Sequence, residues 1–336
     1  MSMAKKMTMA ELADLAGVDI STVSRSLNDS PLVKQKTKDE IFRLASEHGY
    51  VINASARRLR KKSSETLGIV IPLDPKSGQT ISDPFFLEMV GAVTQAAAKR
   101  GYDLIVNIPD STSQIAERRL LQTGRADGLI VIGQAGRVGR LNALGDLSNK
   151  IIVWGGDDKI GNYTVVGSDN IRGGRLAAKH LFERGRDRIL FVGDTGLPEV
   201  KLRYDGMVEA HRDKGIMHDP GLQLSVPFGG KAAFAAIQTF LENRQDFDGL
   251  FAASDVLAIA AIHALRKHGK VAPDDVAIVG YDNIEQSGMV TPSLTTIDQN
   301  IAEGGELLVS LLLDKLDGKD VKSRLTETRL IQRKSS

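Results

Sequence analysis

Ten short runs of β-branched and leucine residues, separated by helical stretches, follow one another from residue 66 onward. Uninterrupted runs of this kind are typical of parallel strands that helices cover on both faces. Ten strands exceed what one compact sheet would hold here, so the pattern predicts two doubly wound parallel-sheet α/β lobes with a ligand crevice at the carboxyl ends of the strands. The runs span residues 67–73, 104–108, 128–132, 151–154, 164–166, 189–192, 222–226, 250–253, 276–279 and 294–297.

The first 50 residues have a different, all-helical pattern. Apolar residues recur at helical spacing in Met9–Ala16, Ile20–Leu27 and 36–48, and a break at Gly17 separates the first two segments. Two short helices joined by a glycine-containing turn form a helix-turn-helix, a motif whose second helix enters the major groove of DNA. We therefore expect an all-α, helix-turn-helix DNA-binding head over residues 1–50.

The second helix of this motif carries side chains suited to DNA. Val23 and Leu27 are expected to pack inward. Ser21, Thr22 and Arg25 then face solvent. Hydroxyl groups at a helix start contact phosphates and base edges, and an arginine donates two hydrogen bonds to guanine. Taken alone, Arg25 would be a solvated surface residue, so its assignment to DNA depends on the motif around it.

The charge distribution agrees with a nucleic-acid partner for the head. The whole chain is nearly balanced, with 44 basic and 42 acidic side chains, whereas residues 1–62 hold 12 Lys and Arg against 7 Asp and Glu. A basic head on a mildly acidic body suggests a polyanionic partner. The chain has no cysteine, which excludes thiolate zinc sites and thiol nucleophiles, and its six histidines show no metal-ligand spacing. We expect no metal and no cofactor.

Residues 8–28, with the sequence TMAELADLAGVDISTVSRSLN, resemble the head of the LacI/GalR family of bacterial repressors. The resemblance continues through residues 31–33 and 49–53 into the family's hinge segment at 56–59. It implies a homodimer that binds double-stranded, near-palindromic operator DNA. No apolar run approaches the ~18–20 residues of a membrane span, and acidic residues interrupt the N-terminus where a signal peptide would be apolar, so we expect a cytoplasmic protein with no membrane association. The DNA contacts it implies are Thr8, Ile20, Ser21, Thr22, Ser24, Arg25, Asn28, Tyr50, Asn53, Ala56, Arg57, Arg58 and Leu59.

The hinge has its own expected role. In the family this segment folds on operator DNA and a leucine enters the minor groove, where Leu59 stands here. Packing of Leu59 against its dimer mate is compatible with that role, and the basic run 57–62 can also be a solvated linker. Three positions depart from the family pattern: Asp19 and Lys34 each replace a serine, and residues 51–52 lack the usual proline. Because an aspartate repels phosphate, the docking at Asp19 is not readable by analogy. The operator sequence is not readable either, because Ile20 and Ser21 occupy the family's specificity positions, which differ between members.

The body carries the same resemblance, and its fold is that of periplasmic sugar-binding proteins. The matching motifs are GIVIP at 68–72, DPFF at 83–86, GSDN at 167–170, RYDG at 203–206, ASD at 253–255, GYD at 280–282 and LTTI at 294–297. The resemblance implies a small effector between the lobes, a mono- or disaccharide or glycoside, with a nucleoside or purine corepressor as the alternative. The expected ligand contacts are Asp83, Phe85, Phe86, Trp154, Ser168, Arg203, Phe228, Ser254, Asp255 and Asp282.

The chemistry of these side chains suits a sugar, although each has a plainer alternative. Sugar hydroxyls need paired donors and acceptors, which Asp282 and Arg203 supply at the start of loops and helices after strands. Those two residues can instead form an internal ion pair. Asp255 and Asn170 can be simple helix caps, and Phe86, Trp154 and Phe228 can belong to the core. Residues 74–82 exceed the family's length and either extend a pocket wall or form a surface loop.

The domain borders expected from these patterns are a hinge at 51–65, a first lobe at 66–163 and 294–322, a second lobe at 164–293 and a C-terminal tail at 323–336. No leucine heptad follows Leu330, so a dimer paired chiefly through the first lobe is expected rather than a tetramer. A two-lobed Rossmann-like enzyme is disfavoured because the glycines at 133–139 depart from the dinucleotide fingerprint. A free periplasmic binding protein would need an export signal, which the N-terminus does not resemble.

Overall fold

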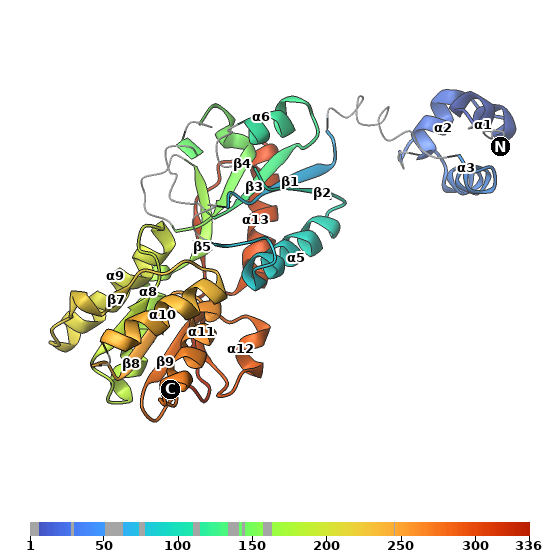
Figure 1. The fold of residues 1–336 in the computed structure, drawn as a ribbon. Helices are drawn as coiled ribbons and strands as arrows, with labels where there is room; N and C mark the ends of the chain where they lie inside the picture. Colours follow the sequence, from blue (N-terminus) through green and yellow to red (C-terminus); the bar gives the residue numbers. More distant parts are fainter. Residues whose placement is uncertain are drawn as a thin grey trace. The chain divides into compact units, whose positions relative to one another are not determined.

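The computed structural model describes residues 7–27, 30–50, 63–73, 78–109, 115–133, 141–142, 145–156, 163–244 and 246–336. They belong to two compact units, a head up to residue 63 and a body from residue 64 (Figure 1). Every helix among these residues is too short or too polar to cross a membrane.

The head is a bundle of three short helices, α1 (Met9–Ala16), α2 (Ile20–Leu27) and α3 (Gln35–Glu47). All three match the expected segments closely. The helices pack around a small apolar core of Leu12, Ala13, Val23, Leu27, Ile41, Leu44 and Ala45. The turn between α1 and α2 depends on Gly17, whose φ of 63° lies in the left-handed region that other residues disfavour.

The first lobe of the body is a six-stranded sheet in the order β11-β5-β4-β3-β1-β2. Its five longer strands are the expected apolar runs: β1 (Thr66–Val70), β2 (Asp103–Asn107), β3 (Gly128–Ile132), β4 (Ile151–Trp154) and β5 (Thr164–Ser168). Helices α5 (Pro84–Ala98) and α13 (Ile301–Leu316) pack against each other and share one apolar core with the sheet. Helix α6 (Ile115–Gln122) and the 3-10 helix η1 (Gly145–Lys150) contribute to a second core.

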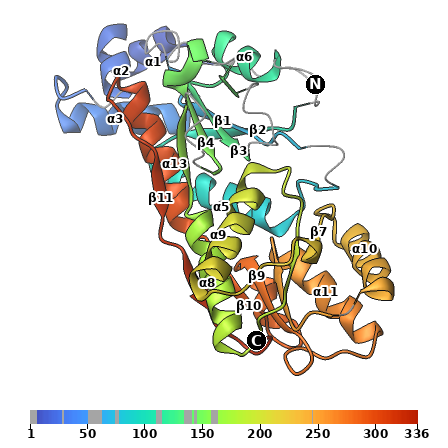
Figure 2. The same ribbon diagram turned by 90° about the vertical axis from the view of Figure 1, so that its left-hand side faces the viewer.

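The second lobe repeats this plan, with a sheet in the order β12-β10-β9-β8-β6-β7. Five of its six strands again lie in expected runs: β6 (Ile189–Val192), β7 (Gln223–Leu224), β8 (Gly249–Ala252), β9 (Ala277–Asp282) and β10 (Thr295–Asp298). Figure 2 shows one helix pair on either side of the strands, α8 with α9 and α10 with α11. The helices of this lobe are α8 (Asn170–Glu183), α9 (Pro198–Lys214), the 3-10 helix η2 (Pro220–Leu222), α10 (Gly230–Asn243), α11 (Asp255–Lys267) and α12 (Glu285–Met289).

The lobe borders differ from those expected from the sequence. Strand β5 belongs to the first sheet, although residues 164–168 were assigned to the second lobe, and β10 belongs to the second sheet, although 294–298 were assigned to the first. The segment expected to be a tail contains β11 (Arg324–Thr326) and β12 (Arg329–Ile331), which form the outer strands of the two sheets. The chain first changes lobe after β5 and changes back after β10, so each of these two strands still pairs in the sheet of the strands that precede it.

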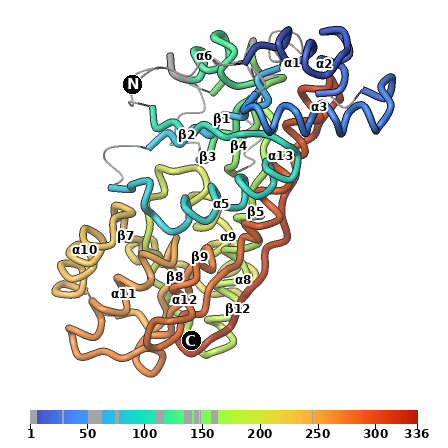
Figure 3. Tube along the Cα trace, turned by 90° about the vertical axis from the view of Figure 1, so that its right-hand side faces the viewer, coloured from blue at the N-terminus to red at the C-terminus, as the bar shows by residue number. Residues whose placement is uncertain are grey.

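The chain therefore crosses between the lobes three times, after β5, after β10 and between β11 and β12. The crossings are bonded to one another: the Thr326 hydroxyl donates to the Gln299 carbonyl at 2.7 Å, and the Asp169 amide donates to the Thr328 hydroxyl at 3.0 Å. In Figure 3 the last segment runs from the end of α13 to the C-terminus in the second lobe. This bonded bundle of crossings joins the lobes on one side of the site described below.

Two glycines allow α8 and α9 to pack at close range. A Cβ atom on Gly174 of α8 would lie 2.0 Å from the Arg203 carbonyl oxygen, and one on Gly206 of α9 would lie 2.0 Å from the Ile171 carbonyl oxygen. Backbone atoms cannot yield to such contacts, so both positions require glycine. The close packing fixes α9, and α9 carries Arg203 into the space between the lobes.

Candidate functional site

The head exposes one side of α2. Ile20 is 51% exposed, and Ser21 and Arg25 are exposed beside it, whereas Thr22 and Ser24 are half-buried. Residues i, i+1, i+4 and i+5 of a helix share a face, so Ile20, Ser21, Ser24 and Arg25 form one stripe, and Thr22 lies beside it. Val23 and Leu27 face the core, as expected. The stripe is the part of the described head that can enter a groove of DNA.

Two other expected DNA contacts, Thr8 and Tyr50, have different surroundings, as does Lys34, which departs from the family pattern. The Thr8 hydroxyl accepts from the Glu11 amide at 3.3 Å and donates to the Glu11 carboxylate at 2.9 Å, which makes Thr8 the cap of α1. Tyr50 packs partly against the core of the head, and burial raises the pKa of its hydroxyl. Lys34, where the family has serine, precedes α3 without a side-chain capping bond. The remaining expected contacts lie outside the described residues: Asn28, Asn53, Ala56, Arg57, Arg58 and Leu59.

The body contains a cavity of about 90 Å³, partly open to solvent, that both lobes line. Eight of the ten expected ligand residues line it: Asp83, Phe85, Phe86, Trp154, Arg203, Phe228, Ser254 and Asp282. Most of them lie at a strand end or near a helix start, which places them at the carboxyl edge of a parallel sheet, whereas Arg203 reaches the cavity from the second turn of α9. Ser168 and Asp255 are buried and are not among the lining residues.

The first lobe supplies a wall rich in aromatic rings. Asp83 caps α5 by accepting from the Phe85 amide at 3.0 Å, which sets the first turn of that helix at the cavity. The rings of Phe85 and Phe86 lie 5.4 Å apart, and Phe86 is buried while Phe85 is half-buried. Trp154 lies at the end of β4. Burial raises the pKa of Asp83. Flat apolar rings next to a carboxyl group are typical of sugar sites.

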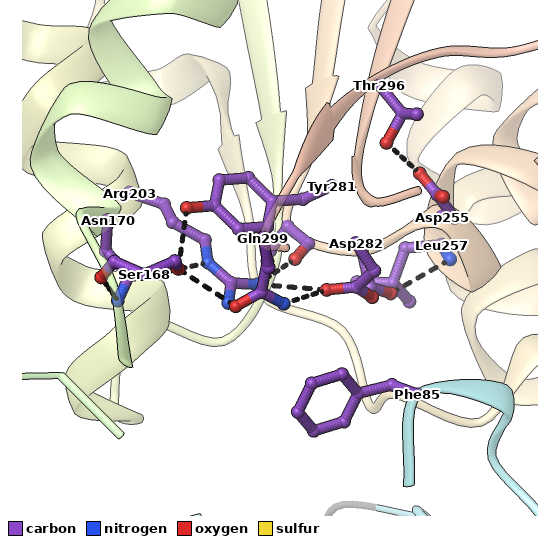
Figure 4. A network of polar contacts seen from close by, with 12 residues as sticks. Phe85, Ser168, Asn170, Arg203, Asp255, Leu257, Tyr281, Asp282, Thr296 and Gln299 are labelled. Carbon is purple, nitrogen blue, oxygen red and sulfur yellow. Dashed lines mark hydrogen bonds and ion pairs between the residues drawn. The ribbon is translucent and has the colours of Figure 1, made fainter. Parts of the chain in front are cut away.

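The second lobe supplies a polar wall held by buried hydrogen bonds (Figure 4). The Arg203 guanidinium donates to Asn170 Oδ1 at 2.8 Å and to the Ala253 carbonyl at 2.5 Å, and lies 3.7 Å from the centre of the Tyr281 ring. Its Nη1 atom is 4.0 Å from Asp282 Oδ1, at the limit of an ion pair. Both side chains are only 8% exposed. The guanidinium is therefore fixed in place before any ligand arrives.

Gln299 connects this wall to the crossings between the lobes. Its amide donates to Asp282 Oδ1 at 2.6 Å and its oxygen accepts from the Ser168 hydroxyl at 2.9 Å. The Ser168 hydroxyl also lies 3.2 Å from the Tyr281 hydroxyl. Ser168 thus sits behind Gln299 instead of facing the cavity, which corrects its expected place. Burial raises the pKa of Asp282 well above its usual value, while the positive charge of Arg203 acts in the opposite direction.

Several lining residues were not expected from the sequence: Pro72, Gln79, Ile132, Gly133, Leu197, Glu199, Val200 and Gln299. Gln79 belongs to the long segment before Asp83, which indeed extends a wall of the cavity. A Cβ atom on Gly229 of the second lobe would lie 3.1 Å from the Gly78 carbonyl oxygen, so this segment reaches across to the other lobe. The signal that could have identified Gln299 is a polar residue directly after a strand end, since β10 ends at Asp298.

Comparison with known proteins decides the family. Residues 8–53 match the description "Bacterial regulatory proteins, lacI family", and residues 178–336 match a "Periplasmic binding protein-like domain". The ribose operon repressor of Halalkalibacterium halodurans is 31% identical over 342 residues, which cover 98% of this chain and 97% of that protein. The HTH-type transcriptional repressor PurR of Aliivibrio fischeri is 31% identical over 329 residues, covering 95% of each. The chain belongs to the LacI family.

A solved structure of another transcriptional regulator supports the same assignment. The CelR–cellobiose complex aligns with this LacI-family chain at a TM-score of 0.72 and 28% identity, over 98% of this chain and 100% of CelR. The family consists of DNA-binding transcription repressors that carry a ligand-binding domain. The predicted fold and family are thereby confirmed: the head is the DNA-binding unit, and the two-lobed body is the ligand-binding unit.

Proposed function

We propose that the body binds a neutral mono- or disaccharide or glycoside in the cavity between its lobes, and that this ligand lowers the affinity of the head for its operator. The observation that supports a neutral ligand is the charge of the cavity wall. Among the residues that the structure describes, three carboxyl groups, Asp83, Glu199 and Asp282, line it together with one cation, Arg203. Such a wall offers an anionic effector only one positive partner, whereas its carboxyl groups can exchange hydrogen bonds with hydroxyl groups.

The aromatic rings support a sugar in particular. Sugars pair hydroxyl groups with flat apolar faces, and the cavity opposes the two: Phe85 on one side faces the network of Arg203 and Asp282 on the other (Figure 4). The cellobiose complex of CelR and the name of the ribose operon repressor point in the same direction. The proposed activity is binding without turnover of the ligand.

We propose that two copies pair through their bodies and place two heads on the half-sites of a near-palindromic operator. Large apolar side chains on the surface of the body support pairing: Leu87 of α5 is 55% exposed and Met289 of α12 is 70% exposed. An apolar groove lined by Val256 and Ile259 of α11 lies on the second lobe. The operator of a bacterial regulator is chromosomal, so the proposed place of work is the cytoplasm.

The DNA half of the proposal is tested with Leu59→Ala. Leu59 holds the position from which the family's hinge leucine enters the minor groove, so its loss should weaken binding to a palindromic operator about 10-fold or more, as expected when a wedge between base steps is removed. The measurement is fluorescence anisotropy of labelled operator at several salt concentrations. Sugar affinity should stay the same. Unchanged operator affinity would remove Leu59 from the DNA interface.

The ligand half is tested by a thermal-shift screen, read together with operator release. The panel holds D-ribose, cellobiose and other neutral sugars, sugar phosphates, and purine bases. A neutral sugar that raises the melting temperature and releases operator supports the proposal. Binding of a sugar phosphate or a purine that strengthens operator binding would contradict it.

A further inference from the structure

Asp255 occupies an unusual place for an acidic residue. It is the first residue of α11, it is fully buried, and it does not line the cavity. Its neighbour Ser254 already caps α11, because the Ser254 hydroxyl accepts from the Leu257 amide at 3.3 Å. A second cap is therefore not needed. A buried carboxyl group without compensation is costly, so its hydrogen-bond partners indicate what it does.

Both carboxyl oxygens of Asp255 are occupied by the segments that surround the end of β9. Oδ2 accepts from the backbone amide of Ile284 at 3.0 Å, and Oδ1 accepts from the Thr296 hydroxyl at 2.5 Å. The Thr296 hydroxyl in turn accepts from the Asn283 amide at 3.3 Å. Asp255 and Thr296 thus accept hydrogen bonds from two consecutive backbone amides, those of Ile284 and Asn283, in the loop that follows Asp282.

This loop needs fastening because its backbone is strained. Asp282 has a φ of 114° and Asn283 a φ of 61°, which are values that residues with a side chain rarely adopt. Such conformations persist only where the surrounding structure holds them. The Arg333 guanidinium adds one more bond, to Asn283 Oδ1 at 2.7 Å. The strain lies at the residue whose carboxyl group faces both Arg203 and the cavity.

The strand itself leaves room for the Asp255 carboxyl group. A Cβ atom on Gly280 would lie 2.2 Å from Asp255 Oδ1, so only glycine fits beside it. The carboxyl group is therefore packed as part of the β9 end, in contact with the strand, the loop and β10. Figure 4 shows Asp255 bonded to Thr296 on the side of Asp282 that faces away from Phe85.

We propose that Asp255 is a positioning residue for effector binding: its carboxyl group holds the Asn283–Ile284 backbone so that Asp282 keeps its strained conformation and presents its side chain to the cavity. This role rests on the proposed function of the cavity as the effector site. It assigns to Asp255 no contact with the effector itself. The proposal also gives a role to the acidic residue at position 255, which lies next to the cavity-lining Ser254 without lining the cavity itself.

The first test needs no effector. Amide hydrogen exchange is measured in the full-length protein, in Asp255→Ala and in Asp255→Asn. Asparagine keeps one acceptor for Ile284 and gives Thr296 a donor in exchange, so its loop should exchange within about threefold of the original protein. Alanine removes both bonds, and exchange at Asn283 and Ile284 should accelerate at least about 10-fold, because it then proceeds through local opening.

Asp275→Ala is the matched control. The exposed Asp275 carboxylate also accepts a backbone amide bond, from Val271 at 2.7 Å, but on a loop that does not line the cavity. Its removal should leave exchange at Asn283 and Ile284 unchanged. Thermal unfolding of all variants, followed by fluorescence of the single tryptophan, identifies any general loss of structure.

The second test uses cellobiose and D-ribose as probes. With whichever sugar binds the original protein, Asp255→Ala should weaken binding about 10- to 100-fold, Asp255→Asn less than about threefold, and operator affinity without sugar should not change. If neither sugar binds, the neutral sugar that the thermal-shift screen identifies serves as the probe, and the exchange experiment still decides the role of Asp255. Unchanged exchange in Asp255→Ala, or equal effects of alanine and asparagine, would overturn the inference.

Discussion

The two walls of the cavity are built on opposite principles. The first lobe contributes mainly rings that pack against an apolar core, with Phe86 and Trp154 almost fully buried. The second lobe contributes charged and polar groups whose positions are set by buried hydrogen bonds. The affinity that apolar contact gives a ligand rises with the buried area and depends little on the ligand's orientation. Polar groups in fixed positions, by contrast, bind well only a ligand whose hydroxyl groups match their pattern. The difference suggests that the first lobe provides general affinity and the second lobe provides selectivity.

The largest expected effect comes from the polar wall. Asp282→Ala removes the carboxyl group that lies next to Arg203 and Gln299, and leaves a buried guanidinium with less compensation. Sugar affinity, measured by quenching of Trp154 fluorescence, should fall more than about 100-fold, equivalent to about 2.7 kcal/mol. Operator affinity without sugar should not change. A sugar response that survives this substitution would place the selective contacts elsewhere.

The polar wall should also make the stability of the body depend on pH. Burial raises the pKa of Asp255 to about 7, with Arg333 acting in the opposite direction, and burial also raises that of Asp282. Between about pH 4 and pH 7 the folded protein then holds protons that the unfolded chain releases. The free energy of unfolding should therefore decrease as the pH rises through this window.

Urea unfolding of the full-length protein, followed at Trp154, measures this dependence. We expect a decrease on the order of 2 kcal/mol, about half of what the full Asp255 shift would give at 1.36 kcal/mol per pH unit, because water and structural relaxation screen buried charges. Asp255→Asn cannot titrate and should flatten the curve. An unchanged slope would mean that Asp255 is ionised in the folded protein at all these pH values.

The aromatic wall should respond more mildly. Phe85 is half-buried and faces the polar network across the cavity, so Phe85→Ala should weaken sugar binding about 10-fold, or about 1.4 kcal/mol, for the loss of one stacking face. Phe85→Leu keeps part of the apolar area and should lose only about threefold. The ratio of affinities for two epimeric sugars should stay constant in both variants. A changed ratio would show that this wall also selects.

The smallest effect is expected at Gln79, a polar residue on the mainly aromatic side. Gln79→Ala should weaken sugar binding about fivefold, close to 1 kcal/mol, the usual worth of one neutral hydrogen bond. Gln238→Ala is the matched control, since that amide accepts from Lys267 on the surface of the second lobe. Equal effects of the two substitutions would exclude Gln79 from the ligand contacts.

The sequence was sufficient to predict most of the fold, because continuous apolar runs of this length separated by helical stretches have few alternatives to buried parallel strands. All ten predicted strands are present. The strands that were missed, β11 and β12, have three residues each and begin with arginine, so their extended form comes from pairing with β5 and β10 and not from local preference. The lobe borders were wrong for the same reason: sequence order does not reveal which sheet a strand joins.

Site residues were predictable where their position at the end of a strand brings them to the cavity. They were not predictable where the direction of the side chain determines whether the residue lines the cavity. Asp282 and Ser254 lie at strand ends and line the cavity, as the pattern indicated. Asp255 also follows a strand end, yet its carboxyl group points toward Ile284 and Thr296. Gln79 belongs to a segment longer than the family pattern, for which there was no motif to read.

The late position of β11 and β12 in the chain has a consequence for biosynthesis. Each sheet receives its outer strand only when residues 324–331 have left the ribosome. Until then each sheet of the ligand-binding body lacks one edge strand, although the head at the N-terminus has long since emerged. A newly made repressor therefore acquires the part that reads DNA well before the part that responds to its signal.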